Sequence, residues 1–93
     1  MRKCISFRVT GRVQGVGFRY FVYHQALELS ISGAVRNEED GSVTGEAQGL
    51  IEAMDEFLRR LQVGPSLSRV ESIETRELQI QLIQGFRIRS EEH

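Results

Sequence analysis

The chain has 93 residues, of which 40% are apolar and 27% are charged, a composition typical of one globular domain with a modest core. Its 12 basic and 13 acidic residues give a formal net charge of -1, which argues against a general nucleic-acid or membrane-surface binder. A single cysteine, Cys4, excludes an intrachain disulfide, and no apolar run reaches the length of a signal peptide or membrane span. We therefore expect one domain over residues 1–93, located in the cytoplasm.

The first half of the chain predicts a strand, a helix and two further strands. Apolar and polar residues alternate over 5–10, the pattern of a half-buried strand. A glycine-rich stretch, 11–17, follows, and apolar residues then recur at helical spacing over 18–29. Short strands are predicted over 32–37 and 42–48.

The second half predicts a helix and one or two strands. An Asp-Gly pair within 39–41 signals the tight turn between the second and third strands. The clearest amphipathic helix of the chain runs over 50–62, and a Gly-Pro pair at 64–65 ends it. A strand is predicted over 70–76, and apolar residues within 86–88 indicate a last short strand.

This order of elements is typical of the ferredoxin-like fold. It predicts an α+β two-layer sandwich, βαββαβ, with an antiparallel sheet, two helices packed on one face and room for a short fifth strand. A helical crossover makes the first two strands point the same way. We therefore expect residues 11–19 and 37–41 to be neighbours at one edge of the sheet.

The glycine-rich turn after the first strand is the strongest chemical signal. Gly11, Gly15 and Gly17 permit unusual backbone angles, which let consecutive N–H groups converge on a phosphate-like anion beside a helix N-terminus. Arg19 falls in the first helical turn, where the helix dipole disfavours a cation unless an anion sits in the loop. A Walker A loop fits badly, because Phe18 and not lysine follows Gly17. A dinucleotide-binding loop fits badly too, because Tyr20 stands where its third glycine is required. The glycine pattern alone leaves a phosphate site and a plain tight turn both open.

Two stretches resemble the signatures of the acylphosphatase family. Residues 9–19, Val-Thr-Gly-Arg-Val-Gln-Gly-Val-Gly-Phe-Arg, are similar to the first signature at every defining position. Residues 33–37, Gly-Ala-Val-Arg-Asn, are similar to the second signature, which continues through Gly41, Val43 and Gly49. The likeness covers nearly the whole chain, and the first signature is long and specific.

The resemblance implies metal-independent hydrolysis of acyl phosphates to carboxylate and phosphate, with no cofactor and no covalent intermediate. It implies that Arg19 and the backbone amides of the loop hold the phosphoryl group, and that Asn37 positions the attacking water. Phosphate or sulfate is expected to occupy the same site. Ala34 stands where the family usually has a large aromatic residue, so we expect less packing near the second strand and an altered acyl side of the pocket. The phosphate-binding residues implied are Gln14, Gly15, Val16, Gly17, Phe18 and Arg19.

Other functions fit the same order of elements. An RNA-binding module would display aromatic residues on its third strand, and residues 42–48 contain none. A non-catalytic regulatory module would bind an anion without turnover, and the presence of both Arg19 and Asn37 favours catalysis. Larger hydrogenase-maturation carbamoyltransferases begin with a similar domain and continue into cysteine-rich zinc segments, which this sequence lacks. We expect a monomeric enzyme that acts on a small-molecule acyl phosphate and binds neither nucleic acid nor a membrane.

The remaining reactive side chains are interpreted as structural. His24 has no evident catalytic partner, and Cys4 is better explained as a small packed thiol than as a nucleophile. The acidic residues at 38–40 lie in a predicted turn, where solvated carboxylates are common, and form too short a set for a metal cage. Aromatic residues interpreted as core are Phe18, Phe21 and Phe57.

Overall fold

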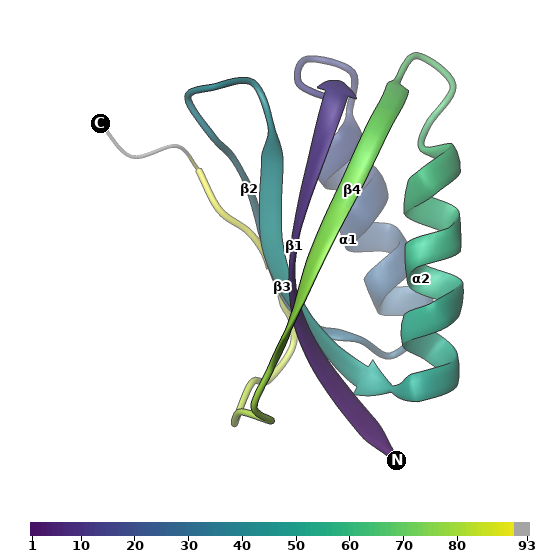
Figure 1. The fold of residues 1–93 in the computed structure, drawn as a ribbon, viewed down its shortest axis with the longest axis vertical. Coiled ribbons are helices and arrows are strands. Elements are labelled where there is room, and N and C mark those ends of the chain that lie inside the picture. The colour runs from purple at the N-terminus through teal and green to yellow at the C-terminus, as the bar shows by residue number, and fades with distance from the viewer. Residues whose placement is uncertain (91–93) are drawn as a thin grey trace.

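Two helices cover one face of a five-stranded sheet, and the opposite face is left open (Figure 1). The structure is a computed structural model that describes residues 1–90. Its two layers confirm the ferredoxin-like α+β fold expected from the order of elements. In chain order the elements are β1 (Arg2–Arg12), α1 (Phe18–Glu28), β2 (Ser32–Asn37), β3 (Val43–Leu50), α2 (Ile51–Val63), β4 (Arg69–Leu78) and β5 (Phe86–Ile88).

The strands lie in the order β4-β1-β3-β2-β5. Both β1 and β2 pair antiparallel with β3, so they point the same way, as the helical crossover requires. The expected short fifth strand is present as β5, and it pairs parallel with β2, which makes an otherwise antiparallel sheet mixed. The β1–α1 loop and the β2–β3 hairpin consequently lie at the same end of the sheet, at the top of Figure 1.

The strand register places one row of apolar residues beneath the helices. Phe7 pairs with Gly45, and a Cβ added to Gly45 would lie 2.6 Å from the Phe7 Cζ atom. Phe7 also meets Phe57 of α2 edge to face, with ring centroids 6.0 Å apart. The glycine therefore leaves room for an aromatic contact that joins the two layers. The buried apolar residues are Cys4, Ile5, Phe7, Val9, Val13, Phe18, Val22, Ala26, Ile31, Val35, Val43, Ala47, Met54, Phe57, Leu61 and Phe86.

The connection between β4 and β5 crosses from one edge of the sheet to the other. Gln48, buried on the central strand β3, donates from Nε2 to the Gln81 carbonyl at 2.8 Å. Its Oε1 accepts from the Gln81 N–H, also at 2.8 Å. Gly33 donates its N–H to the Gly85 carbonyl at 2.9 Å, which fixes the entry into β5. The buried Gln48 amide thus helps to place β5 beside β2. The end of β5 then lies near the start of α1.

Candidate active site

The loop between β1 and α1 has the backbone geometry expected of an anion cradle. Gly15 and Gly17 have φ values of 75° and 78°, in the left-handed region that other residues rarely adopt. Gly17 is also the N-cap of α1, and no side chain caps the helix there. The first N–H groups of a helix have no partners within it. At α1 they are therefore available to a ligand, which the positive end of the helix dipole would hold if it is an anion.

Gln14 ties this loop to the β2–β3 hairpin. Its Nε2 donates to the Glu38 carbonyl at 2.7 Å and to the Ser42 carbonyl at 2.9 Å. The expected proximity of residues 11–19 and 37–41 is confirmed by these contacts. Both N–H donors of the Gln14 side chain are used in holding two loops together, so its backbone N–H is the donor left for an anion.

A pocket of about 200 Å³ opens where the loop, α1, β2 and β5 meet. Five of the seven residues expected in the site line it, and Gln14 and Val16 do not. Val16 is half-buried and packs against the core. The pocket-lining residues are Val13, Gly15, Gly17, Phe18, Arg19, Tyr20, Asn37 and Ile88.

Arg19 reaches the pocket from the first turn of α1 and is half-buried. Its Nη1 donates to the Arg89 carbonyl, just beyond β5, at 2.9 Å. A guanidinium has five N–H donors in a planar fork, so one bond to a carbonyl orients the group and leaves other donors for an anion. This contact could not be predicted from the sequence, because any residue can supply a backbone carbonyl.

Asn37 is the last residue of β2 and is also half-buried. It therefore approaches the pocket from the sheet, whereas Arg19 approaches it from the helix. Of the described residues 1–90, none that lines this pocket carries a carboxylate, a thiol or an imidazole. The pocket therefore combines one cation, a helix N-terminus and a neutral amide. This combination suits an anion and offers no general base.

The hairpin beside the pocket is held by its acidic residues. Asp40 accepts hydrogen bonds from the Ser42 hydroxyl at 2.7 Å and the Ser42 N–H at 2.9 Å, and Arg8 donates to it at 2.7 Å. These contacts, the Ser42 hydroxyl first, lower the pKa of the Asp40 carboxyl. Bonds from Thr44 and Arg36 likewise lower the pKa of Glu38. Both side chains remain partly exposed, as expected of acids in a turn, and their hydrogen bonds also brace the turn.

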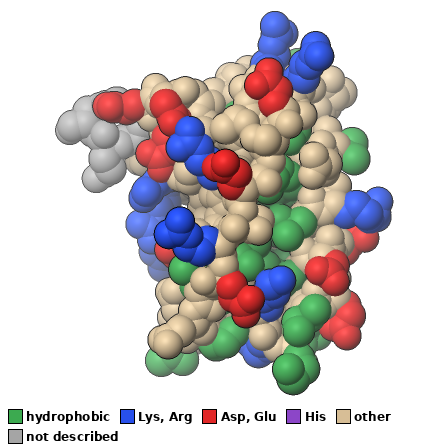
Figure 2. Space-filling view, in the orientation of Figure 1, with side chains coloured by type: hydrophobic (Ala, Val, Ile, Leu, Met, Phe, Trp, Pro, Cys, Tyr) green, Lys and Arg blue, Asp and Glu red, His purple; other side chains and the backbone are tan. Residues whose placement is uncertain are grey.

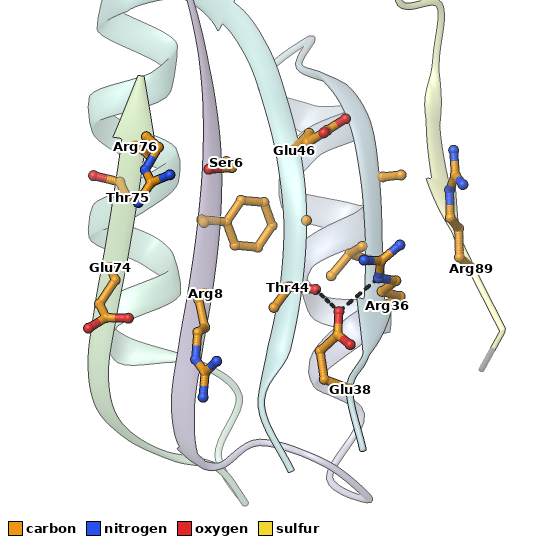
Figure 3. Close-up of a pocket in the computed structure, with 14 residues that line it drawn as sticks. Ser6, Arg8, Arg36, Glu38, Thr44, Glu46, Glu74, Thr75, Arg76 and Arg89 are labelled. Atoms are coloured by element: carbon orange, nitrogen blue, oxygen red, sulfur yellow. Dashed lines mark hydrogen bonds and ion pairs between the residues drawn. The ribbon is translucent and has the colours of Figure 1, made fainter. Parts of the chain in front are cut away.

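A larger groove, about 650 Å³, lies on the open face of the sheet (Figure 3). Its walls carry arginines together with the carboxylates of Glu38, Glu46 and Glu74, and Arg36 is already paired with Glu38 at 2.8 Å. Acidic and basic side chains also lie interspersed over the face seen in Figure 2. Ala34 lines this groove and not the pocket, so its small side chain leaves space on the open face of the sheet, while its expected effect on the acyl side of the pocket stays a prediction.

The acylphosphatase family model matches residues 5–88. The chain belongs to the acylphosphatase family. The acylphosphatase of Aliivibrio fischeri is 45% identical over 87 residues, which cover 94% of this chain and 97% of that protein. The acylphosphatase of Coxiella burnetii superposes with a TM-score of 0.91 at 33% identity, covering 95% of this chain and 93% of that one. For the Bacillus subtilis acylphosphatase the TM-score is 0.90 at 36% identity, covering 95% and 98% of the two chains.

The family assignment confirms the resemblance seen in residues 9–19 and 33–37. It also supports an acylphosphatase enzyme rather than a non-catalytic module, because the similar proteins are themselves named acylphosphatases. Neither helix described within residues 1–90 has the length and hydropathy that a membrane span requires. The same residues contain no group of three or more His, Cys, Asp or Glu side chains placed to hold a metal ion.

Proposed function

We propose that this acylphosphatase hydrolyses the carboxyl–phosphate bond of small acyl phosphates without a metal ion, a cofactor or a covalent intermediate. The observation that carries the proposal is a single pocket lined by Arg19, Asn37 and the glycine-rich loop. Membership of the acylphosphatase family supports the substrate class. A monomeric enzyme in the cytoplasm completes the proposal.

The loop and Arg19 have the chemistry to hold the phosphoryl group. A phosphoryl group presents several oxygens in a tetrahedral array, and N–H groups at a helix start match such acceptors. The Arg19 guanidinium, oriented by the Arg89 carbonyl, would add charge-assisted bonds to the same oxygens. Phosphate and sulfate share this geometry, so both are expected to compete with substrate.

Asn37 would position the attacking water on the side of the phosphorus atom opposite the leaving acyl oxygen. Its carboxamide can orient water but cannot remove a proton at neutral pH. This is sufficient, because phosphoryl transfer commonly has a loose transition state that needs little nucleophile activation. Positioning and charge stabilisation can then supply most of the rate acceleration.

The proposed reaction is balanced without a protein acid or base. The water oxygen forms the new bond to phosphorus, and the bond between phosphorus and the acyl oxygen breaks. Its electron pair leaves with a carboxylate, whose conjugate acid has a pKa of about 4, so no general acid is required. The water proton passes to a phosphoryl oxygen of the substrate, and the products are carboxylate and inorganic phosphate.

The direct test is an assay of acetyl phosphate hydrolysis by the intact chain in excess EDTA. The rate is measured as the release of inorganic phosphate. We expect unchanged rates with and without the chelator, and no hydrolysis of 4-nitrophenyl phosphate, whose leaving group is a poorer one. Competitive inhibition by phosphate and sulfate is expected in the same assay. A rate that collapses in EDTA and returns with added metal would refute the mechanism.

A further inference from the structure

Tyr20 lies at the rim of the pocket, next to Arg19 in the first turn of α1. It lines the pocket and yet remains 65% exposed. A lone exposed aromatic residue needs no explanation by itself. This one, however, borders the site together with the apolar side chains of Val13 and Ile88.

The Tyr20 ring is braced from within its own helix. His24, one helical turn further on, stacks against it with ring centroids 5.7 Å apart and an interplanar angle of 23°. Tyr23 meets His24 edge to face at 5.4 Å and also lies 6.5 Å from Phe86 of β5. A ring held by such contacts loses little freedom when a ligand stacks on it, which favours binding.

The pocket is divided by polarity. Arg19, Asn37 and the glycine loop provide its polar part, while Val13, Ile88 and Tyr20 provide an apolar part. Its volume is about 200 Å³. With a phosphoryl group held by the polar residues, the first atoms of an acyl group would lie against the apolar residues. The rest of a larger acyl group would extend over the rim where Tyr20 lies.

We propose that Tyr20 forms an acyl-binding subsite that favours acyl phosphates with a flat, aromatic acyl group. The proposal rests on the proposed function, because it places the phosphoryl group at the loop and Arg19. The acyl ring would then stack on or against the exposed Tyr20 ring. Offset and edge-to-face arrangements of aromatic pairs are favourable beyond the area that they bury.

The test compares benzoyl phosphate with acetyl phosphate in wild type, Tyr20→Ala and Tyr20→Phe. We expect Tyr20→Ala to lower the ratio of kcat/KM for benzoyl over acetyl phosphate by about 2- to 10-fold, the range of an aromatic contact. Tyr20→Phe keeps the ring and is expected to keep the ratio. Leu27→Ala is the matched control, because Leu27 is a half-exposed apolar residue of the same helix that does not line the pocket.

The outcomes separate this subsite from the proposed function. If all variants hydrolyse both substrates with the wild-type ratio, the subsite is wrong while the enzyme assignment stands. An equal loss on both substrates in Tyr20→Ala also overturns the subsite, since it would show a general structural role. If wild type hydrolyses neither substrate, the proposed function and the subsite both fall. Thermal unfolding of each variant checks that the fold is retained.

Discussion

Asn37 has a position in the pocket that predicts a specific kinetic defect. If it orients water and makes no essential contact with bound phosphate, Asn37→Ala should lower kcat while leaving phosphate affinity nearly unchanged. Loss of one well-placed polar group in comparable sites costs about 10²- to 10³-fold in kcat. We expect a fall of that size, with the inhibition constant of phosphate within about threefold of wild type.

Asn37→Asp is the informative companion variant. It is nearly isosteric, but its carboxylate would lie in a pocket whose lining otherwise carries no acid within residues 1–90. Charge repulsion should therefore weaken phosphate binding as well as turnover. Isothermal titration with phosphate and steady-state kinetics separate the two effects, and wild-type turnover by Asn37→Ala would remove the water-positioning role.

Residue identities in the site were predictable, whereas some of their contacts were not. Arg19 and Asn37 stand in recognisable signature positions and both line the pocket, while their roles there stay predictions. The use of the Gln14 side chain as a tie to the hairpin was not foreseen, since its acceptors are the Glu38 and Ser42 carbonyls. Main-chain acceptors carry no residue signature, and only the folded arrangement of strands brings them into reach.

The β2–β3 hairpin beside the site contains Asp40, whose lowered pKa predicts a contribution to stability that depends on pH. Because the pKa of Asp40 is lower in the folded chain, its carboxylate stabilises the fold above the unfolded pKa of about 3.9. That contribution is lost as pH falls through the lowered value. Asp40→Asn should therefore reduce the stability difference between pH 6 and pH 3, measured by urea unfolding at each pH. If the variant and wild type lose the same stability between pH 6 and pH 3, the Asp40 carboxylate does not contribute.

The connection that delivers β5 to the site depends on Gln48. Replacing it with Ala removes both bonds to Gln81 and leaves a backbone N–H and a carbonyl without their partner. We expect Gln48→Ala to lower the free energy of unfolding by about 1–3 kcal/mol, the cost of unsatisfied polar groups. Because β5 carries the chain to the Arg89 carbonyl that orients Arg19, phosphate affinity should fall as well.

Gln79→Ala is the control for this connection, because Gln79 is exposed and lies just before Gln81. It should leave the unfolding curve and phosphate binding as in wild type. Equal unfolding curves for Gln48→Ala and Gln79→Ala would show that the buried amide does not fix β5. Circular dichroism of both variants verifies that the secondary structure is intact.

Element types were predictable from periodicity, and their ends were less so. The first strand was expected over 5–10, but β1 spans Arg2–Arg12, because its first residues pair with Gly49 and Leu50 of β3. Backbone pairing of this kind leaves no apolar alternation to detect. The parallel pairing of β5 was equally hidden, since it depends on the long connection that Gln48 holds.

At the scale of the whole molecule, the two layers and the pocket share side chains. Phe18, the first residue of α1, is buried in the core and also lines the pocket. Phe86 of β5 meets both Phe57 of α2 and Tyr23 of α1 at 6.5 Å. The pocket is thus formed by elements that the core already holds together. A ligand that binds only the folded chain must then stabilise the entire fold.

This linkage gives a test that needs no substrate. At phosphate concentrations ten times its dissociation constant, binding should add about 1.4 kcal/mol to stability, which for a chain of this size raises Tm by roughly 6 to 11 °C. Sodium chloride at matched ionic strength separates specific binding from screening. Arg19→Ala should abolish most of the shift, because the guanidinium supplies the charged donors, while Arg59→Ala on the exposed side of α2 should keep it. If Arg19→Ala shows the full wild-type shift, the phosphate lies elsewhere, and the assignment of this pocket fails whatever the turnover assays show.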